Sequence, residues 1–377
     1  MRPIQMVDLR SQYLRLKAGI DQAIQGVLLS TEFINGSETK AFEKELSDYT
    51  GSAFTIGCAN GTDALQLALL ALDLPPGAEV ITPSFSYAAL AEMILLCGYK
   101  PVFVEVNPRT FTMDPAALVA AITPATKVIA PVHLYGQCAD MESILHIASK
   151  FNLYVIEDTA QAIGARYTFS NGTVKTAGTM GHIGTTSFFP SKNLGCYGDG
   201  GAVFTQEETL ARKLRMLANH GQRVKYTHEI VGMNSRLDSL QAAILRVKLQ
   251  NLDAFTKARN EVADAYDEAF SHVEGVLVPA RQVGSSHVFH QYTLTFGSAE
   301  IRNDVKDALS ANGIPSMIYY PVPLHRQEAY RQEVSMPLTE DLTERVLSLP
   351  IHTEMDAEQI GFIVSTLKQS IEQTIKQ

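Results

Sequence analysis

The sequence predicts an α/β protein: a mostly parallel, seven-stranded sheet sandwiched by helices, followed by a smaller α+β domain. Three observations lead to this fold class. β-rich runs alternate with helical patterns from residue 54 to residue 205, one gap between runs is too short for a helix, and the pattern changes after residue 255. Strands that are separated by helices pair in parallel, as βαβ units.

The seven β-rich runs begin soon after the helix-breaking Gly51. They lie at 54–58, 79–82, 101–105, 127–132, 153–157, 184–189 and 201–205. Helical patterns fill most of the gaps, at 63–73, 87–97, 114–122 and 140–150. The gap between the sixth and seventh runs has no room for a crossover helix, so these two runs are expected to pair antiparallel.

The length of the chain predicts more than one domain. We expect a large domain at 1–255, with helical patterns at 21–29, 39–49, 207–218 and 237–252 in addition to the alternating region. The second domain, at 256–377, mixes a helix to residue 270, β-like runs at 276–278 and 290–296, and helices at 302–312, 340–347 and the C-terminus.

The composition is that of a globular protein and argues against several function classes. Of 377 residues, 46% are hydrophobic, and the net charge is −9 with no Lys/Arg run that would favour nucleic acid. The four cysteines lack a C-x-x-C spacing, so reduced thiols are expected, with no disulfide and no metal site. No apolar run is long enough for a bilayer and no signal core is present, so we expect a cytoplasmic protein without membrane contact.

Polar side chains follow several of the β-rich runs. The segment 60–63 (Asn-Gly-Thr-Asp) follows the first run, 84–87 (Ser-Phe-Ser-Tyr) the second and 158–161 (Asp-Thr-Ala-Gln) the fifth, and Ser187 and Lys192 come at the end of the sixth. In an open parallel sheet, ligands bind beyond the carboxyl ends of the strands. These distant segments are therefore expected to meet at one edge of the sheet.

Lys192 is the centre of this arrangement. It lies on a short loop between an aromatic, proline-broken strand end and a glycine-rich run. A lysine kept out of water has a lowered pKa, and its neutral amine can form a Schiff base with a carbonyl. Taken alone, the pattern around Lys192 favours a solvated lysine on a turn, because most lysines are exposed to water. The residues expected around it favour the reactive interpretation.

Those residues are suited to a phosphate and a planar ring. Gly61 and Thr62 open a helix whose N-terminus suits a phosphate, or they belong to an ordinary helix cap. Asp158 either caps a helix or, as a buried carboxylate, pairs with a cation such as a protonated pyridine nitrogen. Ser187 either adds a hydroxyl to the phosphate or bonds to backbone, and Tyr87 either stacks on a ring or packs in the core. Together the set describes a site for pyridoxal phosphate (PLP).

Six motifs carry a resemblance to a known family. They lie at 58–65 (CANGTDAL), 155–161 (VIEDTAQ), 187–192 (SFFPSK), 198–201 (GDGG), 220–221 (HG) and 234–238 (NSRLD). In their order and spacing the chain resembles, over essentially its whole length, the PLP-dependent sugar aminotransferases of the DegT/DnrJ/EryC1/StrS family, which have fold type I of the PLP-dependent transferases. Segments 134–140 and 187–201 look most similar to enzymes that aminate carbon 3 of a UDP-linked 3-keto N-acetylglucosaminuronic acid.

The resemblance implies roles for the matching residues of this chain. Lys192 would form the Schiff base and shuttle the proton, and Asp158 would bind the pyridine nitrogen. The other cofactor-binding residues would be Gly61, Thr62 and Ser187 at the phosphate and Tyr87 and Gln161 at the ring.

The resemblance also implies a homodimer with shared active sites. Asn234 would reach the phosphate of the neighbouring subunit, and Arg236 of the same loop would meet the acidic part of the substrate, although a surface ion pair is an equal alternative for Arg236. Tyr319, Tyr320 and His325 would contact the sugar nucleotide. Many relatives have His-Tyr where this chain has Tyr319-Tyr320, and relatives vary at His325.

The implied reaction is a transamination with glutamate as the amino donor and a keto-sugar nucleotide as the acceptor, in cell-surface polysaccharide biosynthesis. A dTDP-3-keto or UDP-4-keto-6-deoxy sugar is the alternative substrate. A PLP-binding sensor without turnover is a remote alternative, because the roughly 50 residues before the sheet leave no room for a DNA-binding module and the chain has no basic patch.

Overall fold

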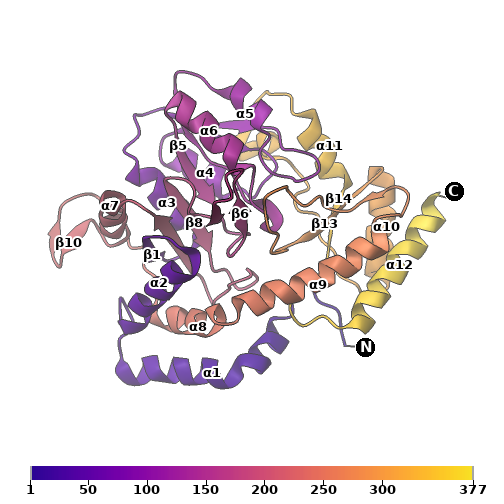
Figure 1. The fold of residues 1–377 in the computed structure, drawn as a ribbon, viewed down its shortest axis with the longest axis horizontal. Coiled ribbons are helices and arrows are strands. Elements are labelled where there is room, and N and C mark those ends of the chain that lie inside the picture. Colours follow the sequence, from indigo (N-terminus) through magenta and orange to yellow (C-terminus); the bar gives the residue numbers. More distant parts are fainter. Residues whose placement is uncertain (1, 376–377) are drawn as a thin grey trace.

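The computed structural model describes residues 2–375, and a seven-stranded sheet forms its centre (Figure 1). The strand order across this sheet is β1-β9-β8-β5-β4-β2-β3. The strands are β1 (Phe54–Cys58), β2 (Glu79–Pro83), β3 (Lys100–Val104), β4 (Thr126–Ile129), β5 (Tyr154–Asp158), β8 (Ile183–Ser187) and β9 (Gly201–Thr205). Each predicted β-rich run overlaps one of these strands, so the predicted sheet is confirmed.

Strand β9 runs against its neighbours. It pairs antiparallel with β8 and with β1, whereas the other neighbouring strands of this sheet pair in parallel. The predicted antiparallel pairing of the sixth and seventh runs is therefore confirmed. Gly201 of β9 lies opposite both Ser187 of β8 and Cys58 of β1. The loop 188–200 thus begins at the carboxyl end of β8 and leads into β9 beside the carboxyl end of β1.

Helices cover both faces of the sheet, as the alternation of side chains along its strands requires. Val80 and Ile156 pack into one apolar cluster with α3, α4 and α7, whereas the adjacent Ile81 and Val155 pack into another with α5 and α6. These helices are α3 (Gly61–Ala71), α4 (Ala89–Leu96), α5 (Pro115–Ala121), α6 (Met141–Phe151) and α7 (Glu208–Ala218). Each overlaps a helical pattern predicted from the sequence.

Four further helices flank the sheet domain: α1 (Leu9–Ser30), α2 (Ser37–Thr50), α8 (Ser239–Leu249) and α9 (Leu252–Phe270). α8 packs between α1 and α2 (Figure 1). The predicted helical stretch 237–252 is interrupted at Gln250 and Asn251, where the Asn251 side chain donates to the Val247 carbonyl. α9 crosses residue 255, so no loop separates the two parts of the chain there, and the division into 1–255 and 256–377 stays a prediction.

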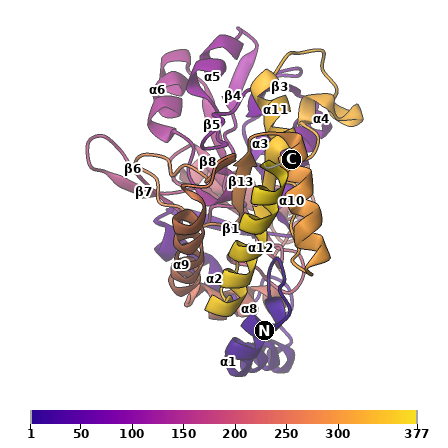
Figure 2. The same ribbon diagram turned by 90° about the vertical axis from the view of Figure 1, so that its right-hand side faces the viewer.

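The C-terminal part has its own antiparallel sheet, in the order β12-β13-β14. Its elements are β12 (Val276–Leu277), β13 (Tyr292–Phe296), α10 (Ala299–Ala311), α11 (Pro337–Arg345), β14 (Val346–Leu349) and α12 (Ala357–Ile375). Figure 2 shows α10 and α12 side by side. The helix predicted over 340–347 ends too late, because Val346 and Leu347 belong to a strand. A short apolar run fits a helix or a strand equally well by periodicity alone.

Several short elements were not predicted. They are the hairpins β6 (Arg166–Thr168)–β7 (Val174–Thr176) and β10 (Gln222–Val224)–β11 (Thr227–His228), and the 3-10 turns η1 (Leu134–Gly136), η2 (Leu324–Arg326) and η3 (Glu328–Tyr330). The β10–β11 hairpin projects at the left of Figure 1. Within residues 2–375, no helix has the length and apolar character to span a membrane, and no cluster of three or more His, Cys, Asp or Glu side chains could hold a metal ion. All four cysteines are free thiols.

Candidate active site

A cavity of about 680 Å³ lies at the carboxyl ends of the large sheet, and most of the predicted site residues line it. They come from the ends of β1, β2, β5 and β8 and from a loop of the C-terminal part, so segments far apart in sequence meet here as expected. The predicted residues in its walls are Gly61, Thr62, Tyr87, Asp158, Gln161, Ser187, Lys192, Tyr319 and Tyr320.

Lys192 lies in the loop 188–200, where its amide donates to the carbonyl of Phe189 at 2.8 Å. The protein around the Lys192 amine lowers its pKa to about 8, because burial disfavours the charged form. The carboxylate of Asp158 opposes this effect but does not cancel it. A substantial fraction of the amine is therefore neutral, and so nucleophilic, near pH 8.

Asp158 is the last residue of β5, and its main chain is fixed on both sides. Its amide donates to Pro131 and its carbonyl accepts from His133, each at 3.0 Å. Burial raises the pKa of the carboxyl, and the Ala160 amide, which donates to Oδ1 at 2.9 Å, together with Lys192, opposes this rise. A carboxylate in this environment fits a cationic ring nitrogen, which would hold it in its charged form.

The start of α3 fits a phosphate. Asn60 is the helix cap: its side chain accepts from the Asp63 amide at 2.8 Å. The cap function is thus taken by Asn60, and the amides of Gly61 and Thr62, in the first turn, have no acceptor within the helix. A Cβ on residue 61 would lie 2.6 Å from the Cβ of Ser187. Only glycine therefore lets this helix end approach the Ser187 hydroxyl so closely.

Aromatic rings and an amide form a further part of the cavity wall. Tyr87 is 62% exposed, and its ring centroid lies 6.2 Å from that of Tyr320. Gln161 donates through Nε2 to the Tyr320 hydroxyl at 3.1 Å, and its Oε1 accepts from the Tyr135 amide at 2.8 Å. The Tyr135 hydroxyl in turn donates to the carbonyl of Tyr319. Hydrogen bonds therefore fix the side chains of Gln161 and Tyr320, whereas Tyr87 remains open to solvent.

Asn234 and Arg236 do not line the central cavity of their own chain. They line a second cavity of about 440 Å³, which shares Asn60 and Asp199 with the central one. Arg236 donates to the Asn219 side chain at 3.4 Å, and its buried Nε has no partner among the described residues.

His325 is also outside the central cavity, so the structure does not bring it together with the other predicted site residues. The ring is fully buried, its Nδ1 lies 2.7 Å from the Ser84 hydroxyl, and its Nε2 lies 2.9 Å from Oε1 of Glu340. Both ring nitrogens are thus engaged with protein. In this structure His325 ties the loop that follows Tyr319 and Tyr320 to the end of β2.

His290 and Gln291 line the cavity but were missed in the sequence. They precede β13, and Arg259 of α9 donates to the His290 carbonyl at 3.3 Å. Burial, with added repulsion from Lys192 and Arg259, holds the pKa of His290 well below its usual value. Polar residues at the start of the predicted run 290–296 were the available signal, but sequence alone does not reveal that the C-terminal part closes this side of the cavity.

Glu157 and His133, which were also not predicted as site residues, stabilise the strand end that carries Asp158. Glu157 points to the other face of β5 and accepts from His133 Nε2 at 2.9 Å and from the amides of Gly178 and Met180 at 2.9 and 2.7 Å. The Ala139 amide donates to His133 Nδ1 at 3.1 Å, so the imidazole proton lies on Nε2. This network fixes the end of β5 on which Asp158 stands.

The fold and the site together define a class: a PLP-dependent transferase in which a lysine loop between two antiparallel strands faces a carboxylate at the end of the central strand. The sequence profile of the DegT/DnrJ/EryC1/StrS aminotransferase family matches residues 15–368. The chain therefore belongs to this family and is a PLP-dependent aminotransferase.

Individual relatives agree with this assignment. The chain is 46% identical to the UDP-2-acetamido-2-deoxy-3-oxo-D-glucuronate aminotransferase of Pseudomonas aeruginosa, over 97% of this chain and 99% of the relative. It is also 46% identical to the UDP-N-acetyl-3-dehydro-alpha-D-glucosamine 3-aminotransferase of Acidithiobacillus ferrooxidans, over 98% of each chain. The crystal structure of DesV from S. venezuelae superimposes with a TM-score of 0.94 at 39% identity, covering 99% of each chain.

Proposed function

We propose that this enzyme transfers the amino group of glutamate to the 3-keto group of UDP-2-acetamido-2-deoxy-3-keto-glucuronic acid. The observation that carries the chemistry is the Lys192 amine, with a pKa of about 8, in one cavity with the Asp158 carboxylate. The two relatives that are 46% identical over nearly their full lengths bear names of UDP-3-keto-sugar aminotransferases, which supports carbon 3 and a UDP-linked sugar.

The cavity residues divide into those that hold PLP and those that act on the substrate. The first-turn amides of Gly61 and Thr62, with the Ser187 hydroxyl, would hold the phosphate. Asp158 would hold the proton on the ring nitrogen, and Tyr87 and Gln161 would lie at the ring. When bound, PLP supplies an electron sink for the bond that breaks at the amino-bearing carbon.

Lys192 would perform two tasks in turn. Its amine would hold the cofactor covalently until an amino substrate displaces it, and the released amine would then move a proton between the substrate carbon and the cofactor. A base whose pKa lies near the working pH is effective in both directions of such a transfer. Burial of the amine provides this pKa, because it disfavours the ammonium form.

The active site would be completed by a second copy of the chain. Asn234 and Arg236 line a cavity that adjoins the central one without entering it, and Ile34 lines the same cavity. The segment around Ile34 exposes a group of large apolar side chains: Leu28, Leu29, Phe33 and Ile34. An exposed apolar patch of this kind is typical of an interface. In a homodimer, Asn234 would reach the partner's phosphate site and Arg236 the acidic part of the sugar nucleotide, with Tyr319 and Tyr320 on the same substrate.

The second relative is named for a sugar without the carboxylate, so the acid at carbon 6 is the finer part of the proposal. A place in cell-surface polysaccharide biosynthesis and a location in the cytoplasm are further parts of the proposal. A dTDP-3-keto sugar is the second candidate, because the chain is 39% identical to the dTDP-3-amino-3,4,6-trideoxy-alpha-D-glucose transaminase of Streptomyces venezuelae.

The deciding experiment is a substrate panel. The purified enzyme is incubated with glutamate and with UDP-3-keto-glucuronate, UDP-3-keto-glucosamine, dTDP-3-keto and UDP-4-keto sugars, and amino products are measured by mass spectrometry. The proposal expects the UDP-3-keto-glucuronate derivative to give the highest kcat/KM. If the UDP-3-keto-glucosamine derivative is turned over equally well, the enzyme does not require the carboxylate at carbon 6, and that part of the proposal is wrong. Turnover of the dTDP sugar alone would overturn the whole proposal.

A further inference from the structure

A buried lysine lies on the outer side of the loop that carries Lys192. Lys248, in the last turn of α8, is only 1% exposed. Its Nζ donates to the carbonyl of Gly195 at 2.5 Å and lies 4.9 Å from the ring centroid of Tyr197. Burial lowers the pKa of the Lys248 amine to about 8. No carboxylate pairs with this lysine among the described residues, so its partners are the loop's own carbonyl and ring.

The same helix contacts the loop at a second point. Gln241 accepts from the Tyr197 amide at 2.8 Å and donates to the Tyr197 carbonyl at 3.4 Å. Both main-chain groups of Tyr197 are therefore held by α8. Lys248 and Gln241 thus hold residues 195–197 through backbone atoms and a ring face. We call these two residues, with Gly195 and Tyr197, the α8 clamp.

Packing within the loop connects the α8 clamp to Lys192. A Cβ on residue 195 would lie 2.3 Å from the Pro190 carbonyl oxygen, so the backbone at Gly195 lies directly against the backbone at Pro190. The Lys192 amide donates to the neighbouring Phe189 carbonyl. A shift of Gly195 would therefore move Pro190 and, with it, the Lys192 side chain.

From this geometry we infer that Lys248 is a positioning residue for Lys192: its ammonium, fixed to Gly195 and Tyr197, keeps the Lys192 amine in its buried place. An apolar side chain of similar length would fill the same space without the free-energy cost of burying an amine. Such an apolar side chain cannot, however, donate a hydrogen bond to the Gly195 carbonyl or bind the face of the Tyr197 ring as a cation. This inference rests on the proposed role of Lys192.

The test compares Lys248→Met, which keeps the length and removes the ammonium, with wild type. The pH dependence of Lys192 labelling by an amine reagent is measured in the cofactor-free protein by mass spectrometry. The wild-type midpoint is expected at about 8. In Lys248→Met the freed loop exposes the amine to water, so the midpoint rises by at least about one unit and labelling near pH 7 slows about tenfold.

Two further variants make the result decisive. Tyr197→Leu removes the ring face and is expected to raise the Lys192 midpoint in the same direction. Lys257→Met is the matched control, because Lys257 is an exposed lysine of α9 that pairs with Glu261 at 3.9 Å; the Lys192 midpoint stays at the wild-type value in this variant. Thermal unfolding of each variant, measured in parallel, identifies any that is misfolded.

A Lys192 midpoint that is unchanged in both folded variants, Lys248→Met and Tyr197→Leu, overturns the inference. Failure of the proposed function is recognised separately. In that case, borohydride reduction of the wild-type holoenzyme, followed by peptide mapping, places the cofactor on a lysine other than Lys192.

Discussion

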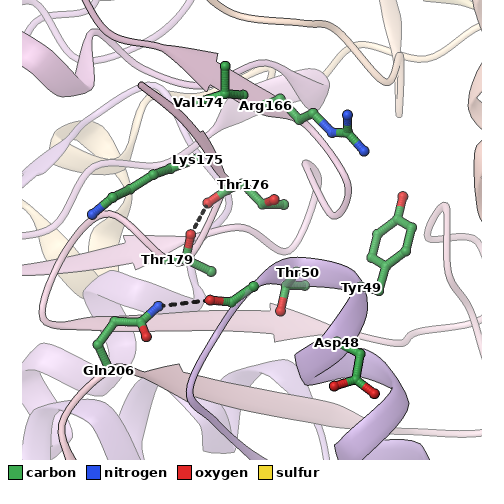
Figure 3. Close-up of a pocket in the computed structure, with 10 residues that line it drawn as sticks. Asp48, Tyr49, Thr50, Arg166, Val174, Lys175, Thr176, Thr179 and Gln206 are labelled. Atoms are coloured by element: carbon green, nitrogen blue, oxygen red, sulfur yellow. Dashed lines mark hydrogen bonds between the residues drawn. The ribbon is translucent and has the colours of Figure 1, made fainter. Parts of the chain in front are cut away.

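Two cavities of this molecule contrast in what surrounds their charged groups. The central cavity encloses Lys192 and Asp158, whereas an outer cavity of about 420 Å³ lies between the end of α2 and the β6–β7 hairpin (Figure 3). Its residues are Asp48, Tyr49, Thr50, Gly51, Arg166, Val174, Lys175, Thr176, Thr179 and Gln206. In Figure 3 the side chains of Arg166 and Lys175 point away from each other.

The outer cavity leaves its charges in water or in pairs. Arg166 and Lys175 are exposed, and Asp48 pairs with Lys44 at 2.6 Å. In the central cavity, burial shifts the pKa of Lys192 down and that of Asp158 up. The difference between the two cavities therefore lies in their charged groups and not in their volumes. In the central cavity the backbone holds a lysine and a carboxylate close together and away from water, and such perturbed pKa values are typical of a reactive site.

The largest expected effect is at Lys192. Lys192→Ala removes the amine that would hold the cofactor and move the proton, so kcat should fall by at least about 10²–10⁴-fold, the usual contribution of a positioned acid–base group. The measurement is single-turnover amino transfer from glutamate, with cofactor content determined separately. Turnover within a few-fold of wild type would remove Lys192 from the reaction.

Asp158→Asn should have the next largest effect. The amide keeps the shape of the side chain but cannot hold a proton on the ring nitrogen by charge, so cofactor binding should weaken by about 1.5–3 kcal/mol, and kcat should fall further. Cofactor affinity is measured by titration of the cofactor-free protein. Unchanged unfolding of that protein is the control, because the amide oxygen can still accept from Ala160. Wild-type affinity and kcat would contradict the assignment.

Arg236→Ala tests whether the second cavity serves the substrate. Loss of a charged hydrogen bond should raise KM for the sugar nucleotide by the equivalent of about 1.5–3 kcal/mol, while KM for glutamate stays the same. Steady-state kinetics with each substrate varied in turn gives both values. An equal rise in the two KM values would indicate a general disturbance of the interface.

A mixture of two inactive variants tests whether the sites are shared. Asn234→Asp places a negative charge against the phosphate, and Lys192→Ala lacks the amine. A hybrid dimer has one site that takes Lys192 from one chain and Asn234 from the other, both wild type, so mixing should restore part of the activity. If subunit exchange is demonstrated and no activity returns, the two residues serve the same chain's site.

The smallest expected effect is at the outer cavity. Arg166→Ala combined with Lys175→Ala should leave kcat and both KM values within about twofold of wild type, because both side chains are exposed and neither lines the central cavity. A large loss of activity in this double variant would mean that exposed charges at a distant hollow also contribute to the reaction.

Most of the large sheet could be predicted because its strands are short apolar runs separated by helices with clear starts. Asp158, Ser187 and Lys192 could be located for the same reason: each ends or follows such a run. His290 and Gln291 could not, because their approach to Lys192 depends on how the C-terminal part packs against the sheet. The two bonds of His325 with Ser84 and Glu340 also depend on tertiary contacts, and no local pattern reports them.

The antiparallel strand β9 also determines where the loop that carries Lys192 joins the sheet. Because Ser187 and Gly201 lie opposite each other, residues 188–200 leave and return at one point of the sheet. The sheet therefore fixes only the two ends of the segment that carries the reactive lysine, and the contacts of residues 195–197 with α8 fix where the segment lies between them.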